Sequence, residues 1–402
     1  MNTALLSARK RTIAGELRAE MELCGRSVLS WQVDLARSAG CERIICLCDA
    51  PTPEIIELQR GIEASGGEFH AIKSSLQLVS LLRTDETLVM ILDGLVADAK
   101  VARRLMVEGG KLSKAVFTIE AGSDLTEAYP ADFERIDATR CWAGIAVFRA
   151  AVAQKLADLP PDGEVSSLLL RLALQSQTET IPIDFDEMAE TDWVLAKDHG
   201  QLALREDAML DDAMPRNRWS GPIAAIAGKV VRLGGAKWIA QGPLVPSILA
   251  VVAAAIAALL VSYHYVVTGL ALATFGALLA AFTRIVSHAC LALDGAKKQS
   301  LISRNISAIT DILAVMSLCI AFISQPAAII ALPILTMGLL RLAERNSAPG
   351  VAPFWNDRAL HLAGLTVCAA YGILSEGLAV LGLLALAQAL VGKSLTNPFA
   401  GK

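Results

Sequence analysis

The sequence has few aromatic residues and no excess of basic charge. Aromatic side chains make up 5% of the 402 residues, and 36 Lys and Arg stand against 40 Asp and Glu, a net charge of −4. Chains that bind nucleic acid usually carry a clustered basic excess, so we expect no nucleic-acid partner. The first twenty residues also lack the long apolar stretch of a secretory signal, so membrane targeting is expected to rest on later segments.

The eight cysteines do not show the paired spacing of a metal-binding motif. The closest pair, Cys46 and Cys48, lies in a short apolar run, and Cys290, Cys319 and Cys368 lie in long apolar stretches. Buried free thiols in a reducing compartment are therefore the simplest interpretation.

Apolar residues are abundant, and they are unevenly distributed. They make up 54% of the sequence, and the mean hydropathy is +0.50. Charged and apolar residues alternate up to about residue 218, whereas long apolar runs dominate from Pro243 onward. This pattern predicts a soluble domain over 1–205, a linker with an interfacial helix over 206–242, and an all-α transmembrane bundle over 243–402.

The second half contains six apolar stretches, each close to the roughly 20 residues that cross a hydrocarbon layer. They cover 244–262, 265–286, 308–324, 326–342, 359–374 and 376–392. Lys and Arg gather before the first stretch and after the second, fourth and sixth. This places both termini of a multi-pass inner-membrane protein in the cytoplasm. Small residues over 269–276 offer a close-packing face, so we expect a homodimer through membrane helices.

The segment over 219–239, WSGPIAAIAGKVVRLGGAKWI, spaces its apolar residues as a helix does and interleaves Lys and Arg. A tryptophan near each end is typical of a segment at a membrane surface, which favours an interfacial amphipathic helix. Its four glycines weaken a helix, and a solvated linker is the alternative.

The first half alternates helical and strand-like segments. Helices are predicted over 27–39, 54–65 and 75–82, and strands over 43–48, 68–72 and 87–92. This order predicts a Rossmann-like α/β fold with a parallel sheet. Ligands of such sheets bind beyond the carboxyl ends of the strands, where Asp93 follows TLVMIL.

Several ordered segments carry a resemblance to a known family. The segments GRSVLSWQ over 25–32, AGCERII over 39–45 and VMILDG over 89–94 resemble the nucleotidyltransferase (GT-A-like) fold of sugar-phosphate and alditol-phosphate cytidylyltransferases, inositol-phosphate enzymes among them. CWAGIAVF over 141–148 and DFD over 184–186 resemble later motifs of that family.

The resemblance implies a site for CTP and a divalent cation. Its phosphate-binding loop would carry three basic residues: Arg9, Lys10 and Arg11. Asp93 would hold Mg²⁺ or Mn²⁺ together with Asp184 or Asp186. The family's loop is rich in glycine, whereas the segment over 4–11 has none. The alternative is that Asp93 ends a strand and the other two aspartates are solvated.

The apolar half resembles a CDP-alcohol phosphatidyltransferase. LDGAKKQS over 293–300 and SRNISAITD over 303–311 resemble its signature, in which aspartates on two neighbouring helices bind the divalent cation that holds a CDP-alcohol. The resemblance implies that Asp294 and Asp311 are catalytic and bind the metal, and that Lys297 and Lys298 contact phosphate.

This sequence departs from that signature at two of its four carboxylates. Leu291 and Val315 stand where the family has aspartates, and Ser307 replaces a glycine. Two carboxylates hold a cation weakly, which favours loss of the chemistry. Together the halves predict a membrane-bound homologue of the bifunctional enzymes that make a CDP-alditol and transfer its phosphoryl-alditol to a lipid or alcohol. The alternative is a pseudoenzyme that regulates or scaffolds envelope lipid synthesis and needs no cofactor.

Overall fold

The computed structural model describes residues 1–160, 163–184, 192–213, 221–234, 236–294, 301–347 and 351–396. Asp186, Lys297 and Lys298 of the predicted sites lie outside these residues, as does Trp219. The chain divides into two compact units, Met1–Ala208 and Met209–Lys402. The boundary falls close to the one predicted from composition.

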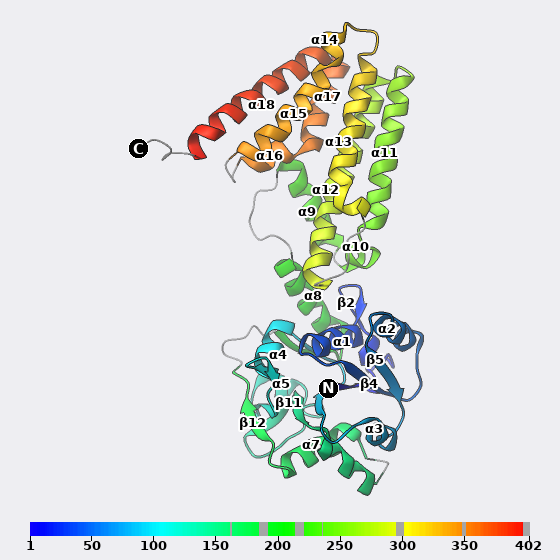
Figure 1. Ribbon diagram of the computed structural model, residues 1–402, viewed down its shortest axis with the longest axis vertical. Coiled ribbons are helices and arrows are strands. Elements are labelled where there is room, and N and C mark those ends of the chain that lie inside the picture. Colours follow the sequence, from blue (N-terminus) through cyan, green and yellow to red (C-terminus); the bar gives the residue numbers. More distant parts are fainter. Residues whose placement is uncertain are drawn as a thin grey trace. The chain divides into compact units, whose positions relative to one another are not determined.

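A seven-stranded sheet forms the first unit (Figure 1), in the order β12-β10-β11-β6-β1-β4-β5. The strands are β1 (Asn2–Ala8), β4 (Arg43–Cys48), β5 (Glu68–Ile72), β6 (Thr87–Ile91), β10 (Ala115–Glu120), β11 (Arg140–Arg149) and β12 (Glu179–Pro182). The α/β prediction is confirmed, but the sheet is not wholly parallel, because β11 runs antiparallel to β10 and β6. The connection over 121–139 holds only a five-residue helix, and such a short link suits antiparallel neighbours.

Helices and short strands complete the first unit. The helices are α1 (Val28–Ser38), α2 (Pro53–Ala64), α3 (Ser75–Leu81), α4 (Ala99–Met106), α5 (Asp124–Ala128), α6 (Ala150–Ala153), α7 (Val165–Gln175) and α8 (His199–Ala213), with 3-10 turns at Arg18–Glu20 and Gln154–Asp158. The short strands are β2 (Glu22–Leu23), β3 (Arg26–Ser27), β7 (Leu95–Ala97), β8 (Val107–Glu108), β9 (Lys111–Leu112) and β13 (Trp193–Leu195).

The predicted helices and strands of the first unit are confirmed to within one or two residues. All six residues of β4 are buried, as its continuous apolar run requires. Ser27, Thr52 and Ser74 cap the three predicted helices by accepting a hydrogen bond from a backbone N–H three residues on. None of the eight cysteines is joined in a disulfide bond.

Strand β11 carries a glycine that its neighbours make necessary. Gly144 has φ +94°, and a Cβ there would lie 3.1 Å from Leu92 Cβ. The backbone beside it is fixed by two buried indoles: Trp142 donates to the carbonyl of Ile145, and Trp193 donates to the carbonyl of Ala143. The chain therefore cannot move aside to accept a side chain.

We expect Gly144→Ala to lower the free energy of unfolding of the first unit by about 2–4 kcal/mol, because it adds backbone strain and a steric overlap. Hydrogen exchange of β11 peptides across a urea series in the full chain measures this locally. Gly122→Ala is the matched control, since an added Cβ there meets nothing within 4 Å, and it should change the same midpoint little. Equal midpoints for the two variants would contradict the prediction.

The second unit is helical (Figure 1). Its helices are α9 (Pro222–Gly234), α10 (Ala236–Gln241), α11 (Leu244–Ser262), α12 (Val266–Asp294), α13 (Leu301–Ala321), α14 (Ala327–Ile330), α15 (Leu332–Asn346), α16 (Ala352–Asn356), α17 (Arg358–Ala370) and α18 (Leu374–Thr396). Helices occupy all six predicted spans. Among the described residues, three segments are long and apolar enough to cross a membrane: Leu244–Ser262, Val266–Leu293 and Leu374–Val391.

The predicted amphipathic segment forms two helices, α9, which ends at Gly234, and α10, which begins at Ala236. The inner face of α9 packs Ala227 and Val231 against Phe282 and Val286 of α12. Its exposed face carries Ile226 and Val230, which are 56% and 43% exposed. Exposed apolar residues on a helix with an exposed lysine are typical of a helix at a membrane surface.

Candidate functional site

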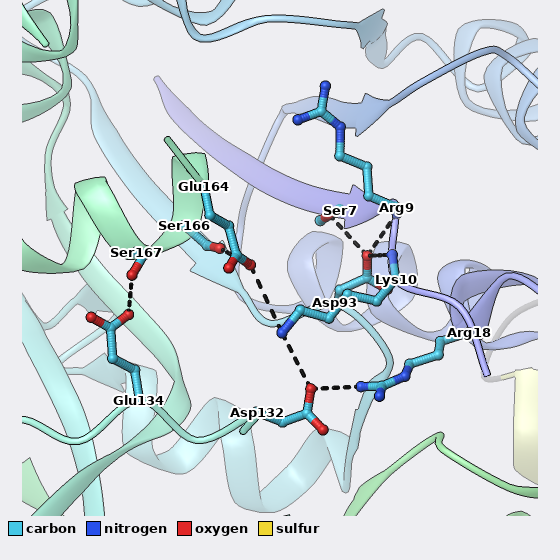
Figure 2. Close-up of polar contacts among 10 residues, drawn as sticks. All are labelled: Ser7, Arg9, Lys10, Arg18, Asp93, Asp132, Glu134, Glu164, Ser166 and Ser167. Atoms are coloured by element: carbon cyan, nitrogen blue, oxygen red, sulfur yellow. Dashed lines mark hydrogen bonds and ion pairs between the residues drawn. The ribbon is translucent and has the colours of Figure 1, made fainter. Parts of the chain in front are cut away.

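In the first unit, Asp93 organises the loop that follows β1. Its Oδ2 accepts hydrogen bonds from Ser7 Oγ at 2.9 Å, from the backbone N–H of Arg9 at 2.7 Å and from that of Lys10 at 2.9 Å (Figure 2). Asp93 is only 3% exposed, and this burial raises its pKa while the N–H donors of Lys10 and Arg9 oppose the rise. Two loop amides that could approach a phosphate therefore donate to a carboxylate of the protein.

The basic side chains of this loop also have internal partners. Lys10 Nζ lies 3.2 Å from Asp132 Oδ1 and 3.8 Å from Glu164 Oε1, and the buried Arg18 donates to the same Asp132 oxygen at 2.8 Å (Figure 2). Burial raises the pKa of Asp132, but hydrogen bonds and charge from Arg18 and Lys10 outweigh it, so the net shift is downward. Arg9 Nε pairs with Asp49 Oδ1 at 3.1 Å.

A cavity of about 270 Å³ lies at the carboxyl end of β1. Arg9, Lys10 and Ser7 line it together with the first turn of α7 at Glu164–Ser166. Arg11 does not line it and instead donates to the carbonyl of Gly15 at 2.7 Å. Two of the three basic residues predicted from the sequence thus reach one cavity, although acidic side chains offset their charge.

The structure does not bring Asp93 and Asp184 into one described cluster. Asp184 follows β12, and β10 and β11 separate that strand from β6, which ends next to Asp93. Three strand spacings amount to about 14 Å. No group of three or more metal-ligating side chains occurs in the part of the chain that the structure describes.

In the second unit, a polar cavity of about 200 Å³ lies among the apolar helices. Its charged and amide side chains come from α12, α13, α15 and the α16–α17 region: Arg284, Asp311, Arg341, Glu344, Asn356, Asp357 and Arg358. Charged side chains within apolar helices are costly and usually have a function. This cavity is therefore the candidate site of the second unit.

Asp311 is held by two arginines. Arg341 Nη2 donates to its Oδ2 at 2.6 Å, and Arg358 Nε lies 3.4 Å from the same oxygen. Arg358 also pairs with Glu344 at 3.1 Å. The sequence predicted Asp311 as a site residue. Its partners Arg341 and Arg358 were used only as part of the positive charge between the apolar stretches, which orients the protein in the membrane. The sequence carried one signal for this pairing, namely an aspartate within one apolar stretch and arginines at the ends of others.

Along the axis of α12, Asp294 does not lie at the level of the cavity that Asp311 lines. It is the last residue of α12, ten residues beyond Arg284, which lines the cavity with Asp311. Ten helical residues span about 15 Å. The described residues of α12 that line the cavity are Arg284 and three alanines, Ala277, Ala280 and Ala281.

Comparisons with known proteins give likenesses to solved structures and no sequence match. No family profile matches this chain, and no curated protein matches it. Among solved structures, the inositol-1-phosphate CTP transferase from T. maritima is similar at a TM-score of 0.38 and 12% identity, over 50% of this chain and 91% of that one.

The residues of the bundle cavity do not fit the divalent cation of the family that this half resembles. Asp311 is the signature carboxylate among the described lining residues, and Arg341 and Arg358 both pair with it. A bound Mg²⁺ needs several oxygen ligands and would lie next to two guanidinium groups. The described residues of the cavity therefore do not fit a magnesium site.

Proposed function

We propose that this chain is a membrane-anchored pseudoenzyme, a relative of the bifunctional enzymes that make and use CDP-alcohols, and that it takes part in envelope lipid synthesis without transferring phosphoryl groups. One observation carries the proposal: the ion pairs of Asp311 with Arg341 and Arg358. A carboxylate engaged by two guanidinium groups is poorly placed to bind a metal or to take a proton from an acceptor hydroxyl.

The first unit supports the same proposal. The segment over 4–11 lacks glycine, and the amides of Arg9 and Lys10 donate to Asp93. A nucleoside triphosphate needs free backbone N–H groups of this kind and a divalent cation to offset its charge. We infer that this unit has kept the α/β fold and an altered cavity, and that it does not transfer a cytidylyl group.

The membrane placement is part of the proposal. The three apolar spans support a membrane protein, and the positions of Lys and Arg support cytoplasmic termini at the inner membrane. Its partners would be a membrane lipid and a second copy of the chain, with neither CTP nor a CDP-alcohol consumed.

A turnover assay on the purified full-length protein in detergent tests this directly. With Mg²⁺ or Mn²⁺, we expect no release of pyrophosphate from CTP with alditol phosphates, and no release of CMP from a CDP-alcohol with an alcohol acceptor. Asp93→Asn and Asp311→Asn are the matched controls and should give the same background. Metal-dependent release that falls by about 100-fold or more in either variant would establish catalysis and overturn the proposal.

A further inference from the structure

We propose that the bundle cavity binds a phosphate group without any divalent cation, and that the guanidinium group of Arg341 stands against Asp311 where a metal ion would otherwise stand. The inference rests on the proposed function and deepens it by naming the ligand chemistry of the site. The shared chemistry is a phosphate group, carried either by a lipid head group or by a free phosphate.

Among the described residues, the cavity is lined by three arginines and three carboxylates, and one of the arginines is not held in an ion pair. Asp311 pairs with Arg341 and Arg358, and Glu344 pairs with Arg358. Arg284 forms no ion pair with a described residue and donates only to the neutral amide oxygen of Asn356, at 3.2 Å. The partly buried Arg284 is therefore the guanidinium group of the cavity that is free to take an anionic ligand.

The third acidic side chain of the cavity does not neutralise Arg284. Asp357 is 4% exposed, and its two oxygens accept from the backbone N–H groups of Ile223 at 2.8 Å and Leu360 at 3.2 Å. These donors belong to the first turns of α9 and α17, whose positive ends compensate the carboxylate. Three guanidinium groups thus face two carboxylates that are engaged in ion pairs.

The arrangement suits a phosphate group in shape as well as in charge. The side chains of Asp311 and Arg358 are 9% and 10% exposed, whereas that of Arg341 is 46% exposed. Arg341 therefore forms an open rim over a buried floor. A guanidinium group can donate two parallel hydrogen bonds to phosphate oxygens, and ion pairs strengthen where water is scarce.

The volume sets an upper limit on the ligand. At about 200 Å³ the cavity is smaller than the roughly 300–1,000 Å³ of ordinary small-molecule sites. A phosphate group with a small substituent fits this volume, whereas a complete CDP-alcohol does not. Phosphate oxygens would replace Asp311 as the anionic partner of Arg341, so Arg341 exchanges one ion pair for another. The same phosphate group would give Arg284 an anionic partner.

Binding measured in EDTA separates this inference from the family's metal-dependent site. Full-length protein in detergent is titrated with inorganic phosphate and, separately, with a short-chain phosphatidic acid, with either EDTA or Mg²⁺ present. We expect saturable binding of at least one probe in EDTA, with an affinity within about twofold of that in Mg²⁺. Binding of the phosphatidic acid alone would identify the ligand as a lipid head group. Binding of both probes would show that the phosphate group itself is sufficient.

Two variants with opposite expected effects test the residues. Arg341→Met should weaken binding by about tenfold or more, because it removes a charged donor. Its matched control is Arg345→Met, an exposed arginine one turn along α15 that does not line the cavity, and it should bind as the wild type does. Asp311→Asn should tighten binding in EDTA, since it removes the carboxylate that competes for Arg341 and Arg358.

The outcomes are distinct from those of the turnover assay. No saturable binding in EDTA, with the protein monodisperse and helical, overturns this inference and leaves the absence of transfer untouched. Binding that needs Mg²⁺ and is lost in Asp311→Asn overturns it in favour of a metal site. Equal binding by the Arg341 and Arg345 variants overturns the role of Arg341.

Discussion

Asp93→Ala is expected to lower the free energy of unfolding of the first unit by about 2–4 kcal/mol, because it leaves buried donors without an acceptor. The donors are Ser7 Oγ and the backbone N–H groups of Arg9 and Lys10, all bonded to one carboxylate oxygen. The loop after β1 should then detach locally before the sheet unfolds. Hydrogen exchange of peptides over residues 3–12 in the full chain would show faster exchange at Arg9 and Lys10.

Asp93→Asn distinguishes an anchor from a metal ligand. The asparagine side chain keeps one oxygen of the same shape, so it should retain most of the protection and lose about 1 kcal/mol. Added Mg²⁺ should slow exchange equally little in the wild type and in the variant. If Mg²⁺ protects the loop of the wild type and not that of Asp93→Asn, Asp93 binds a metal and the anchor role is wrong.

The sequence is sufficient to place the elements of the first unit but not the role of Asp93. Strands β4 and β5 are found at their predicted residues, because short apolar runs between turn residues can hardly form anything else in this order. The position of Asp93 at a strand end was also predictable. Its hydrogen bonds reach more than 80 residues back to Arg9 and Lys10, and no local pattern encodes such a contact.

The same limit applies to the bundle. Asp311 was predicted as a site residue from the resemblance to the phosphatidyltransferase signature, but its partners lie 30 and 47 residues further along, on other helices. The same resemblance implied a role for Asp294, which ends α12 about 15 Å along the helix from Arg284, a residue that lines the cavity. Charge pairing across helices depends on packing, which a single sequence does not display.

Both units have kept an acidic residue at a site position and given it an internal partner. Asp93 accepts backbone N–H groups, and Asp311 accepts guanidinium groups. In each case the carboxylate stabilises the surrounding fold in a way that needs no metal. An acidic residue at such a position is therefore not by itself evidence of a metal site.

Asp357→Ala is expected to have a comparable effect in the second unit. Asp357 caps α17 through Leu360 N–H and also accepts from Ile223 N–H at the start of α9. Losing a helix cap costs about 1 kcal/mol, and a buried unpaired N–H costs about 1–3 kcal/mol more. We expect α9 to separate from α12, which hydrogen exchange of peptides over 221–234 would detect in protein reconstituted in lipid nanodiscs.

Because Asp357 accepts through both carboxylate oxygens, a variant that keeps one of them should have an intermediate effect. An asparagine has a single acceptor oxygen, so Asp357→Asn can satisfy Leu360 or Ile223 but not both, and its exchange should fall between those of the wild type and Asp357→Ala. Glu376→Ala, which removes an exposed acid at the start of α18, should leave α9 protected. If Asp357→Ala leaves exchange in α9 unchanged, packing of Ala227 and Val231 alone holds that helix, and the carboxylate serves only to cap α17.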